Sequence, residues 1–195
     1  MSALSLDDLV GNGTMSAAMA ATLRATAEAR RSYLVIALPR LAGKSTVGRA
    51  MLDVARRTGA PIRELGEDGT DVAALAVEAR GGYLYVPEVS ESPVTDGYVW
   101  GAPVRTAFAE IAGGTALSTA VHADSPEDAL DVLRESEVPE TDLARLSVIV
   151  HLRSFGDWRA PTRRVVAGVY ATELRAGRAT ARALHRWNEA RDRFE

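Results

Sequence analysis

The sequence predicts an α/β domain with a mainly parallel sheet. Short apolar runs alternate with segments of helical periodicity along most of the chain, which is the pattern of strands and helices in turn. The run Tyr33–Ala37 is continuously apolar and is followed closely by Pro39, as expected of a strand buried on both faces. Of the 195 residues, 47% are hydrophobic and 25% are charged, so the chain can bury a sizeable core.

Helices are predicted on either side of this first strand. Leu4–Val10 is expected to form a short amphipathic segment, and Ser16–Arg31 a helix with Ser16 as its N-cap. After the strand, a helix is predicted from about Lys44 to Thr58, and Gly59 ends it.

The middle of the chain continues the alternation. Strands are expected at Ile62–Leu65, Tyr83–Val86 and Thr115–Thr119, and helices at Thr70–Ala79 and Trp100–Ala112. The stretch Ser125-Pro126-Glu127-Asp128 predicts the start of a further helix. Serine is a favoured N-cap, proline suits the first helical position, and acids suit the first turn.

Three late strands are predicted to extend the sheet in antiparallel fashion, since short turns join them: Ser147–Arg153, Arg163–Ala171 and about Thr180–Trp187. We therefore expect a single domain over residues 1–195. It has lead-in helices at 4–31, a core at 32–153 and C-terminal strands at 154–195.

Composition excludes several classes of protein. The net charge of −3 and the lack of a basic block do not indicate nucleic acid as a partner. Without cysteine there are no disulfides, no thiol catalysis and no cysteine-based zinc site. No apolar run approaches the roughly 18 residues of a membrane span, and no signal peptide is evident, so we expect a cytoplasmic protein.

The segment between the first strand and its helix matches a phosphate-binding pattern. Gly43-Lys44-Ser45 fits the end of G-x-x-x-x-G-K-[ST], the P-loop, between a strand and a helix. Leu38 replaces the first glycine. The phosphate cradle, however, comes mainly from the later N–H groups, those of Leu41, Ala42, Gly43, Lys44 and Ser45. Arg40 adds a positive charge that can reach phosphate. The other interpretation is an ordinary strand-turn-helix in which the motif arises by chance.

The use of lysine favours the nucleotide interpretation. Lys44 is the one lysine among the 23 basic residues; all the others are arginine. A planar, forked guanidinium does not replace the compact ammonium that a P-loop needs, so the bias toward arginine stops at this position. We therefore expect the segment from Leu38 to Thr46 to hold the phosphates of ATP.

Three further positions are candidates for chemistry beside the phosphates. Glu88 follows an apolar strand, where this class of sheet collects ligand groups, and can orient the attacking water; the alternative is a solvated glutamate after an edge strand. His122, before a capped helix, can sense the γ-phosphate or bond loop backbone instead. Glu67-Asp68 can bring a second acidic pair to this edge or form an acidic turn. His151 and His185 follow strand alternation and are interpreted as structural.

Taken together, these stretches resemble the ATPases of type II secretion, type IV pili and type IV secretion. Val86-Pro87-Glu88 is similar to the family's hydrophobic-Gly-Glu motif, and the stretch from Ser118 to Ser125 to its histidine box. Glu67-Asp68 looks like the family's acidic box, whose glutamate is implicated in catalysis. The resemblance covers about residues 4–175. Departures include Leu38, Pro87 and a missing turn histidine, and the large N-terminal domain is absent, so the chain looks like a minimal form.

The resemblance implies a RecA-like fold and an ATPase that converts ATP and water to ADP and phosphate. Ser45 would ligate Mg²⁺, while Glu88, Glu67 and His122 would serve catalysis. It also implies a homohexameric ring and a membrane-embedded secretion or pilus platform as partner, which would place the protein at the inner face of the membrane. Two alternatives stay open. They are a nucleotide-binding module that does not hydrolyse ATP, favoured by Leu38 and Pro87, and a small-molecule kinase, disfavoured by the lack of an arginine-rich lid.

Overall fold

The computed structural model describes residues 4–66, 71–91 and 98–195. Within these ranges the strands form one sheet, and β4 (Tyr98–Val99) pairs with the end of β3 beside the main path. That path runs in the order β2 (Ile62–Glu64), β3 (Tyr83–Val89), β5 (Ala116–Val121), β1 (Tyr33–Ile36), β6 (Val148–Asp157), β7 (Ala160–Arg175), β8 (Arg178–Asn188), β9 (Arg193–Phe194). Neighbours from β2 to β6 are parallel and those from β6 to β9 antiparallel. The predicted fold class, an α/β domain with an antiparallel C-terminal extension, is confirmed.

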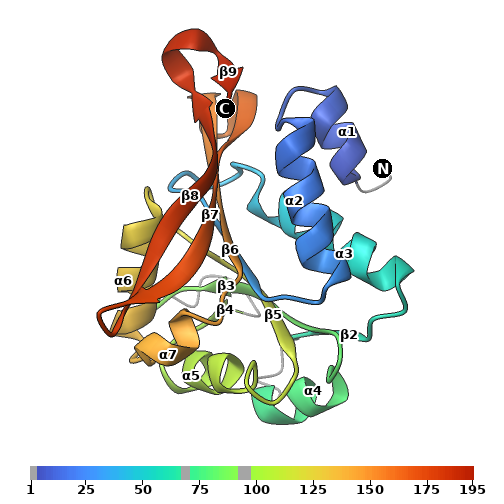
Figure 1. Cartoon of the computed structure of the whole chain (residues 1–195), viewed down its shortest axis with the longest axis vertical. Helices are drawn as coiled ribbons and strands as arrows, with labels where there is room; N and C mark the ends of the chain where they lie inside the picture. The colour runs from blue at the N-terminus through green and yellow to red at the C-terminus, as the bar shows by residue number, and fades with distance from the viewer. Residues whose placement is uncertain (1–3, 67–70, 92–97) are drawn as a thin grey trace.

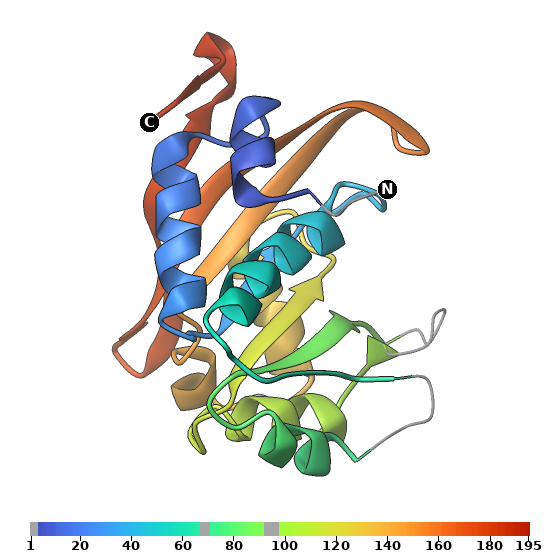
Figure 2. The same cartoon turned by 90° about the vertical axis from the view of Figure 1, so that its right-hand side faces the viewer.

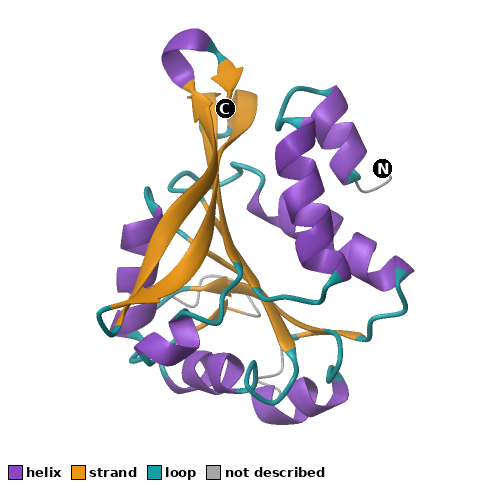
Figure 3. Ribbon diagram, in the orientation of Figure 1, coloured by secondary structure: helices purple, strands orange, loops and turns teal. Residues whose placement is uncertain are grey.

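Helices cover both faces of the sheet (Figures 1 and 3). One layer consists of α1 (Leu6–Gly11), α2 (Ala17–Glu28) and α3 (Lys44–Arg57). The opposite layer consists of α4 (Val72–Glu78), α5 (Ala102–Ala109), α6 (Pro126–Glu135) and α7 (Glu140–Leu143). Each layer has its own apolar core, and the central strands β1, β3 and β5 between them are buried on both sides.

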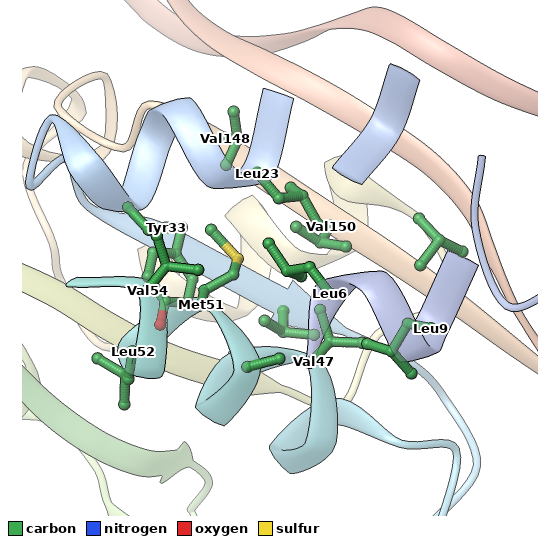
Figure 4. Close-up of a cluster of buried hydrophobic side chains, with 14 of the residues drawn as sticks. Leu6, Leu9, Leu23, Tyr33, Val47, Met51, Leu52, Val54, Val148 and Val150 are labelled. Carbon is green, nitrogen blue, oxygen red and sulfur yellow. The ribbon is translucent and has the colours of Figure 1, made fainter. Parts of the chain in front are cut away.

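Strand β1 shows how the sequence divides between the two cores. Tyr33 and Val35 face the α1–α3 layer, whereas Leu34 and Ile36 face the other, because successive strand residues point to opposite faces. All four are at most 1% exposed, which explains the continuous apolar run. Figure 4 shows the first core, in which residues of α1, α2 and α3 pack against β1 and β6: Leu6, Leu9, Leu23, Tyr33, Val47, Met51, Leu52, Val54, Val148 and Val150.

Helix caps lie close to where the sequence placed them. The Ser16 side chain accepts a hydrogen bond from the Met19 N–H at 3.1 Å, and Ser125 caps α6 in the same way. At α4 the cap is Asp71; Thr70 lies outside the described residues. Helix α5 begins at Ala102 rather than at Trp100, because Gly101 before it has a φ of 67°, which no helical residue adopts.

Strand β3 is longer than predicted and irregular near its end. It runs to Val89, and its pairing with β5 shifts register between Val86 and Val89, so that it carries one extra residue there. Pro87 lies within this bulge. A proline has no N–H to give to a neighbouring strand, and a bulge is where an interior strand can accommodate one. Glu88 therefore lies inside the strand and is only 6% exposed.

The C-terminal strands are also longer than predicted. Strands β6 and β7 form a hairpin that projects beyond the helices, and β7 and β8 form a second long pair (Figure 2). Glu140 at the start of α7 ties this extension to the helical layer. Its carboxylate accepts hydrogen bonds from the Arg134 guanidinium at 2.7 Å and from the Ala179 N–H of β8 at 2.7 Å. The hydrogen bond from Arg134 is the main cause that lowers the pKa of Glu140 to about 2.

Candidate functional site

The P-loop segment (residues 38–46) connects the end of β1 to the start of α3 at the centre of the sheet. Helix α3 begins at Lys44, so its first N–H groups have no partner within the helix and point toward the segment. Gly43, directly before it, has a φ of 99°, a conformation that favours glycine. Leu38 is not among the residues with positive φ, so its backbone does not require the glycine it replaces; Leu41, in contrast, has a φ of 60°.

Two side chains from distant strands hold the carbonyl groups of this segment. The Nδ1 atom of His122, just after β5, lies 3.0 Å from the Leu38 carbonyl oxygen. Because a carbonyl only accepts, this hydrogen bond needs a proton on Nδ1, whereas a hydrogen bond from the Lys44 ammonium to the same nitrogen, 3.2 Å away, needs its lone pair. The Nε atom of Arg164 on β7 donates to the Leu41 carbonyl oxygen at 2.9 Å. These bonds fix the part of the segment that lacks the usual glycine.

Lys44, Glu88 and His122 form a compact charged cluster beside the segment. The Lys44 Nζ atom lies 3.5 Å from Glu88 Oε2 and 3.2 Å from the nearer ring nitrogen of His122. Lys44 and Glu88 side chains are each 8% exposed, and His122 is 31% exposed. Glu88 Oε1 lies 2.7 Å from His122 Nε2 but without hydrogen-bond geometry, and it has no hydrogen-bond partner among the described residues.

Burial and neighbouring charges change the pKa values of Glu88 and Lys44 in this cluster to different extents. Burial raises the pKa of the Glu88 carboxyl, but the contacts with His122 and Lys44 outweigh burial and bring that pKa below its ordinary value. Burial lowers the pKa of the Lys44 ammonium; Glu88 offsets this in part, and the charge of Arg40 adds to it. Glu88 is therefore ionised at neutral pH, and the charge of Lys44 is only partly compensated. An added anion would stabilise it.

A cavity of about 730 Å³ opens over this cluster. One side is formed by residues 40–47, together with Glu88, Tyr98 and His122. Other walls come from the N-terminal helices and from β6 and β7: Leu4, Leu9, Asn12, Thr14, Leu152, Thr162, Arg163 and Arg164. The volume lies in the range of pockets that enclose a small molecule.

The structure brings most of the expected site residues together. Arg40, the stretch from Leu41 to Thr46, Glu88 and His122 all line this cavity. Glu67 and Asp68 lie outside the described residues, so their role stays a prediction. His151 is buried in β6, where burial lowers its pKa, and His185 lies 2.8 Å from the Thr22 hydroxyl.

Sequence reasoning did not identify the wall formed by Asn12, Thr14 and Arg164. The sequence places Arg164 only within a late strand, and the two polar residues lie in a turn between the N-terminal helices. The spacing from Gly43 to Arg164 contains no motif, since the contact depends on how β7 pairs with β6. The available signal was only the expectation that β6 and β7 close the sheet as an antiparallel pair.

Comparisons with known proteins show the fold. No family model and no curated protein matches the chain. Among solved structures, it matches the VirB11 ATPase from the Brucella suis type IV secretion system, in complex with sulphate. The TM-score is 0.55 at 16% identity, covering 85% of this chain and 54% of the other. It also matches the Legionella pneumophila ATPase DotB, with a TM-score of 0.54 at 12% identity, covering 90% of this chain and 52% of the other.

This chain therefore has the fold of secretion ATPases, and the resemblance predicted from the sequence is confirmed at that level. It spans about half the length of the two matched proteins. None of the helices within residues 4–66, 71–91 and 98–195 is long and apolar enough to cross a membrane.

Proposed function

We propose that this chain binds ATP in the cavity over residues 40–47 and hydrolyses it to ADP and phosphate. The observation that supports this most is the buried Lys44–Glu88–His122 cluster at the start of α3, where an under-compensated ammonium and free helical N–H groups meet. The Lys44 ammonium, the Glu88 carboxylate and the His122 ring line one cavity that is large enough for a nucleotide.

Phosphate binding follows from the charges of the P-loop segment. The N–H groups of residues 41–45 and the Lys44 ammonium hold the β- and γ-phosphates, as oriented backbone dipoles and a compact cation do. Arg40 is exposed and lines the cavity, so its guanidinium supplies a second positive charge. Binding of the phosphates removes part of the cost of burying Lys44, because it adds the anionic partner that Glu88 provides only at 3.5 Å.

For hydrolysis, we propose that Glu88 orients the attacking water. Its carboxylate is ionised and lies at the wall of the cavity beside Lys44 and His122, where it is proposed to accept a hydrogen bond from the attacking water once the γ-phosphate engages Lys44. His122, linked to both Glu88 and the Leu38 carbonyl, is placed to sense whether the γ-phosphate is present. Glu67 is proposed to assist Glu88, by resemblance to the acidic box of secretion ATPases.

The residues present also fit Mg²⁺. Ser45 is exposed to the cavity in the first turn of α3, and the Glu88 carboxylate supplies a further hard oxygen, reached through water. A bound Mg²⁺ would neutralise the charge that develops on the phosphates during transfer.

Assembly and location are proposed from the resemblance. We expect a homohexameric ring that works beside a membrane-embedded secretion or pilus platform, at the cytoplasmic face of the membrane. Native mass measured with and without ATP tests the ring; a monomer under both conditions, at high protein concentration, would contradict it.

A rival function is ATP binding without hydrolysis. The contact between Glu88 and Lys44 favours it, because a carboxylate engaged by the P-loop lysine is not free to act on water. Phosphate release at high protein concentration, with ATP and Mg²⁺, separates the two: sustained release supports the ATPase, and binding without release supports the module.

Lys44→Ala tests the phosphate site common to both functions. We expect loss of ATP binding in calorimetry with an unchanged circular dichroism spectrum, because the Lys44 ammonium acts on phosphate rather than in the apolar core. Arg57→Ala is the matched control, since Arg57 is an exposed cation at the far end of α3. Tight binding by a folded Lys44→Ala protein would remove the phosphate site from this cavity.

A further inference from the structure

The cavity extends well beyond the P-loop segment. Phosphates held at residues 41–45 occupy one side of a space of about 730 Å³. The opposite walls come from the turn between α1 and α2, with Asn12 and Thr14, and from β7, with Arg164. The proposed phosphate chemistry gives none of these residues a role, although all of them line the same cavity.

The α1–α2 turn is firmly held against β7. The Thr14 carbonyl accepts a hydrogen bond from the Val166 N–H at 2.7 Å. Asn12 Oδ1 accepts two more, from the Thr14 N–H at 3.1 Å and from its hydroxyl at 2.7 Å. No hydrogen bond joins the Asn12 amide nitrogen to the residues that the structure describes, so both its hydrogens are available to a ligand. Leu9, buried at 3% exposure, adds an apolar surface beside the turn.

Arg164 faces the turn from β7. It lies two residues before Val166, whose side chain packs in the α1–α3 core, so both point to the same face of the sheet. Its stem rests on the P-loop segment: a methyl group at Gly43 would lie 3.3 Å from Arg164 Cδ. Nε is bonded to the Leu41 carbonyl, which anchors the plane of the guanidinium at the cavity wall.

The neighbouring Arg163 has different contacts from those of Arg164. Arg163 is paired with Asp192 at 2.5 Å and lies over the Trp187 ring. Arg164, in contrast, makes no ion pair with a carboxylate in the described ranges, and its terminal nitrogens remain free for a ligand.

We propose that the α1–α2 turn and Arg164 form the nucleoside subsite, which holds the base and ribose while the P-loop segment holds the phosphates. A guanidinium is planar, weakly hydrated and stacks on aromatic rings, which suits a base. The Asn12 amide donates hydrogen bonds, and ring nitrogens and ribose hydroxyls accept them. The subsite rests on the proposed function for its phosphate end, and it makes ATP affinity depend on residues from both ends of the chain.

The test compares ATP with inorganic tripolyphosphate, which has no nucleoside, by calorimetry. We expect the unmodified protein to bind ATP at least about thirtyfold more tightly. Asn12→Asp keeps the Oδ1 acceptor of the turn but removes the amide donors, and Arg164→Lys keeps the charge but removes the stacking plane. The added carboxylate and the lost bond to the Leu41 carbonyl each weaken both ligands, so the readout is the ratio of the two affinities. Each variant should lower the preference for ATP over tripolyphosphate about tenfold. Arg159→Lys, at the tip of the β6–β7 hairpin outside the cavity, is the control and should change neither affinity.

Several results would overturn the subsite. Equal losses of both ligands would make Arg164 a phosphate ligand, and unchanged ATP binding in both variants would place the nucleoside elsewhere. Equal affinity of the unmodified protein for the two ligands would also refute it, while leaving the phosphate site intact. Loss of the phosphate site itself is distinguished by Lys44→Ala, which must abolish binding of both. If Arg164→Lys melts below the assay temperature, Asn12→Asp decides.

Discussion

Replacing Glu88 by glutamine tests the central claim about chemistry. Glutamine keeps the shape and hydrogen-bonding reach of the side chain but removes the base and the charge. Loss of a positioned acid–base group costs about 10² to 10⁴ in rate, so we expect hydrolysis to fall by about 10² or more. The assay is steady-state phosphate release at saturating ATP and Mg²⁺. Glu28→Gln is the control, because Glu28 is exposed on α2 outside the cavity.

The same variant should bind ATP more tightly. At the 3.5 Å between Lys44 Nζ and Glu88 Oε2, the gross attraction is about 5 kcal/mol for an effective dielectric constant of about 20. Most of this is not recovered, because Lys44 can contact a phosphate and Glu88 at once. We expect a gain of roughly twofold to tenfold in affinity, or about 0.4 to 1.4 kcal/mol.

Without ATP, the variant should be less stable. Glu88→Gln leaves Lys44 buried without its anion, and breaking a buried pair costs up to about 3–5 kcal/mol. We expect about 1–3 kcal/mol less free energy of unfolding in urea, since the original contact is long, and recovery when ATP is added. Unaltered turnover, or weaker ATP binding, would refute the assignment of Glu88. Undetectable turnover in the unmodified protein would favour the non-hydrolysing module.

Three further predictions follow from single contacts. Leu38→Gly should leave ATP affinity within a few-fold, because Leu38 has no positive φ and the N–H groups lie downstream; a hundredfold gain would instead mark a decayed site. Glu140→Gln should lose about 1–2 kcal/mol in urea at pH 7, allowing for its 30% exposure. Since the folded pKa is about 2 against 4.5, this loss is fully present above pH 4.5 and fades toward pH 2; a pH-independent loss would contradict it. Gly82→Ala places a methyl carbon 1.9 Å from the Pro61 carbonyl oxygen and should lower the free energy of unfolding by about 1–3 kcal/mol. Gly11→Ala is the control, because the space around Gly11 is open, and it should not lower it. Equal melting temperatures of the two variants would contradict this prediction.

The core of the fold was predictable because its signals are local. The apolar run of β1 and the caps Ser16 and Ser125 each determine structure within a few residues, and the structure places them close to the predicted positions. The ends of helices and strands were less predictable where they depend on the backbone conformation of one residue. Gly101 delays α5, and Pro87 sits inside β3 rather than ending it, because a bulge accommodates it.

The site was predictable only for residues that belong to a motif. Lys44 and His122 follow β1 and β5, and Glu88 lies near the end of β3. Because these strands are parallel, their ends bring the three residues to one edge of the sheet. Arg164 and Asn12 reach the cavity through the pairing of β7 with β6 and the packing of the α1–α2 turn. The contacts that complete the cavity, from Arg164 to Leu41 and from Val166 to Thr14, join segments more than 100 residues apart and leave no pattern in the sequence.

The bulge in β3 has a consequence for how the sheet is paired. Pro87 offers no N–H to a neighbouring strand, and the extra residue leaves the Glu88 backbone outside the regular β3–β5 pairing, which resumes at Val89. On the other side of β3, Glu88 pairs with Tyr98 of β4. The bulge therefore lies where β4 joins the sheet, and the residue that carries the carboxylate of the site is anchored to β4 rather than to β5.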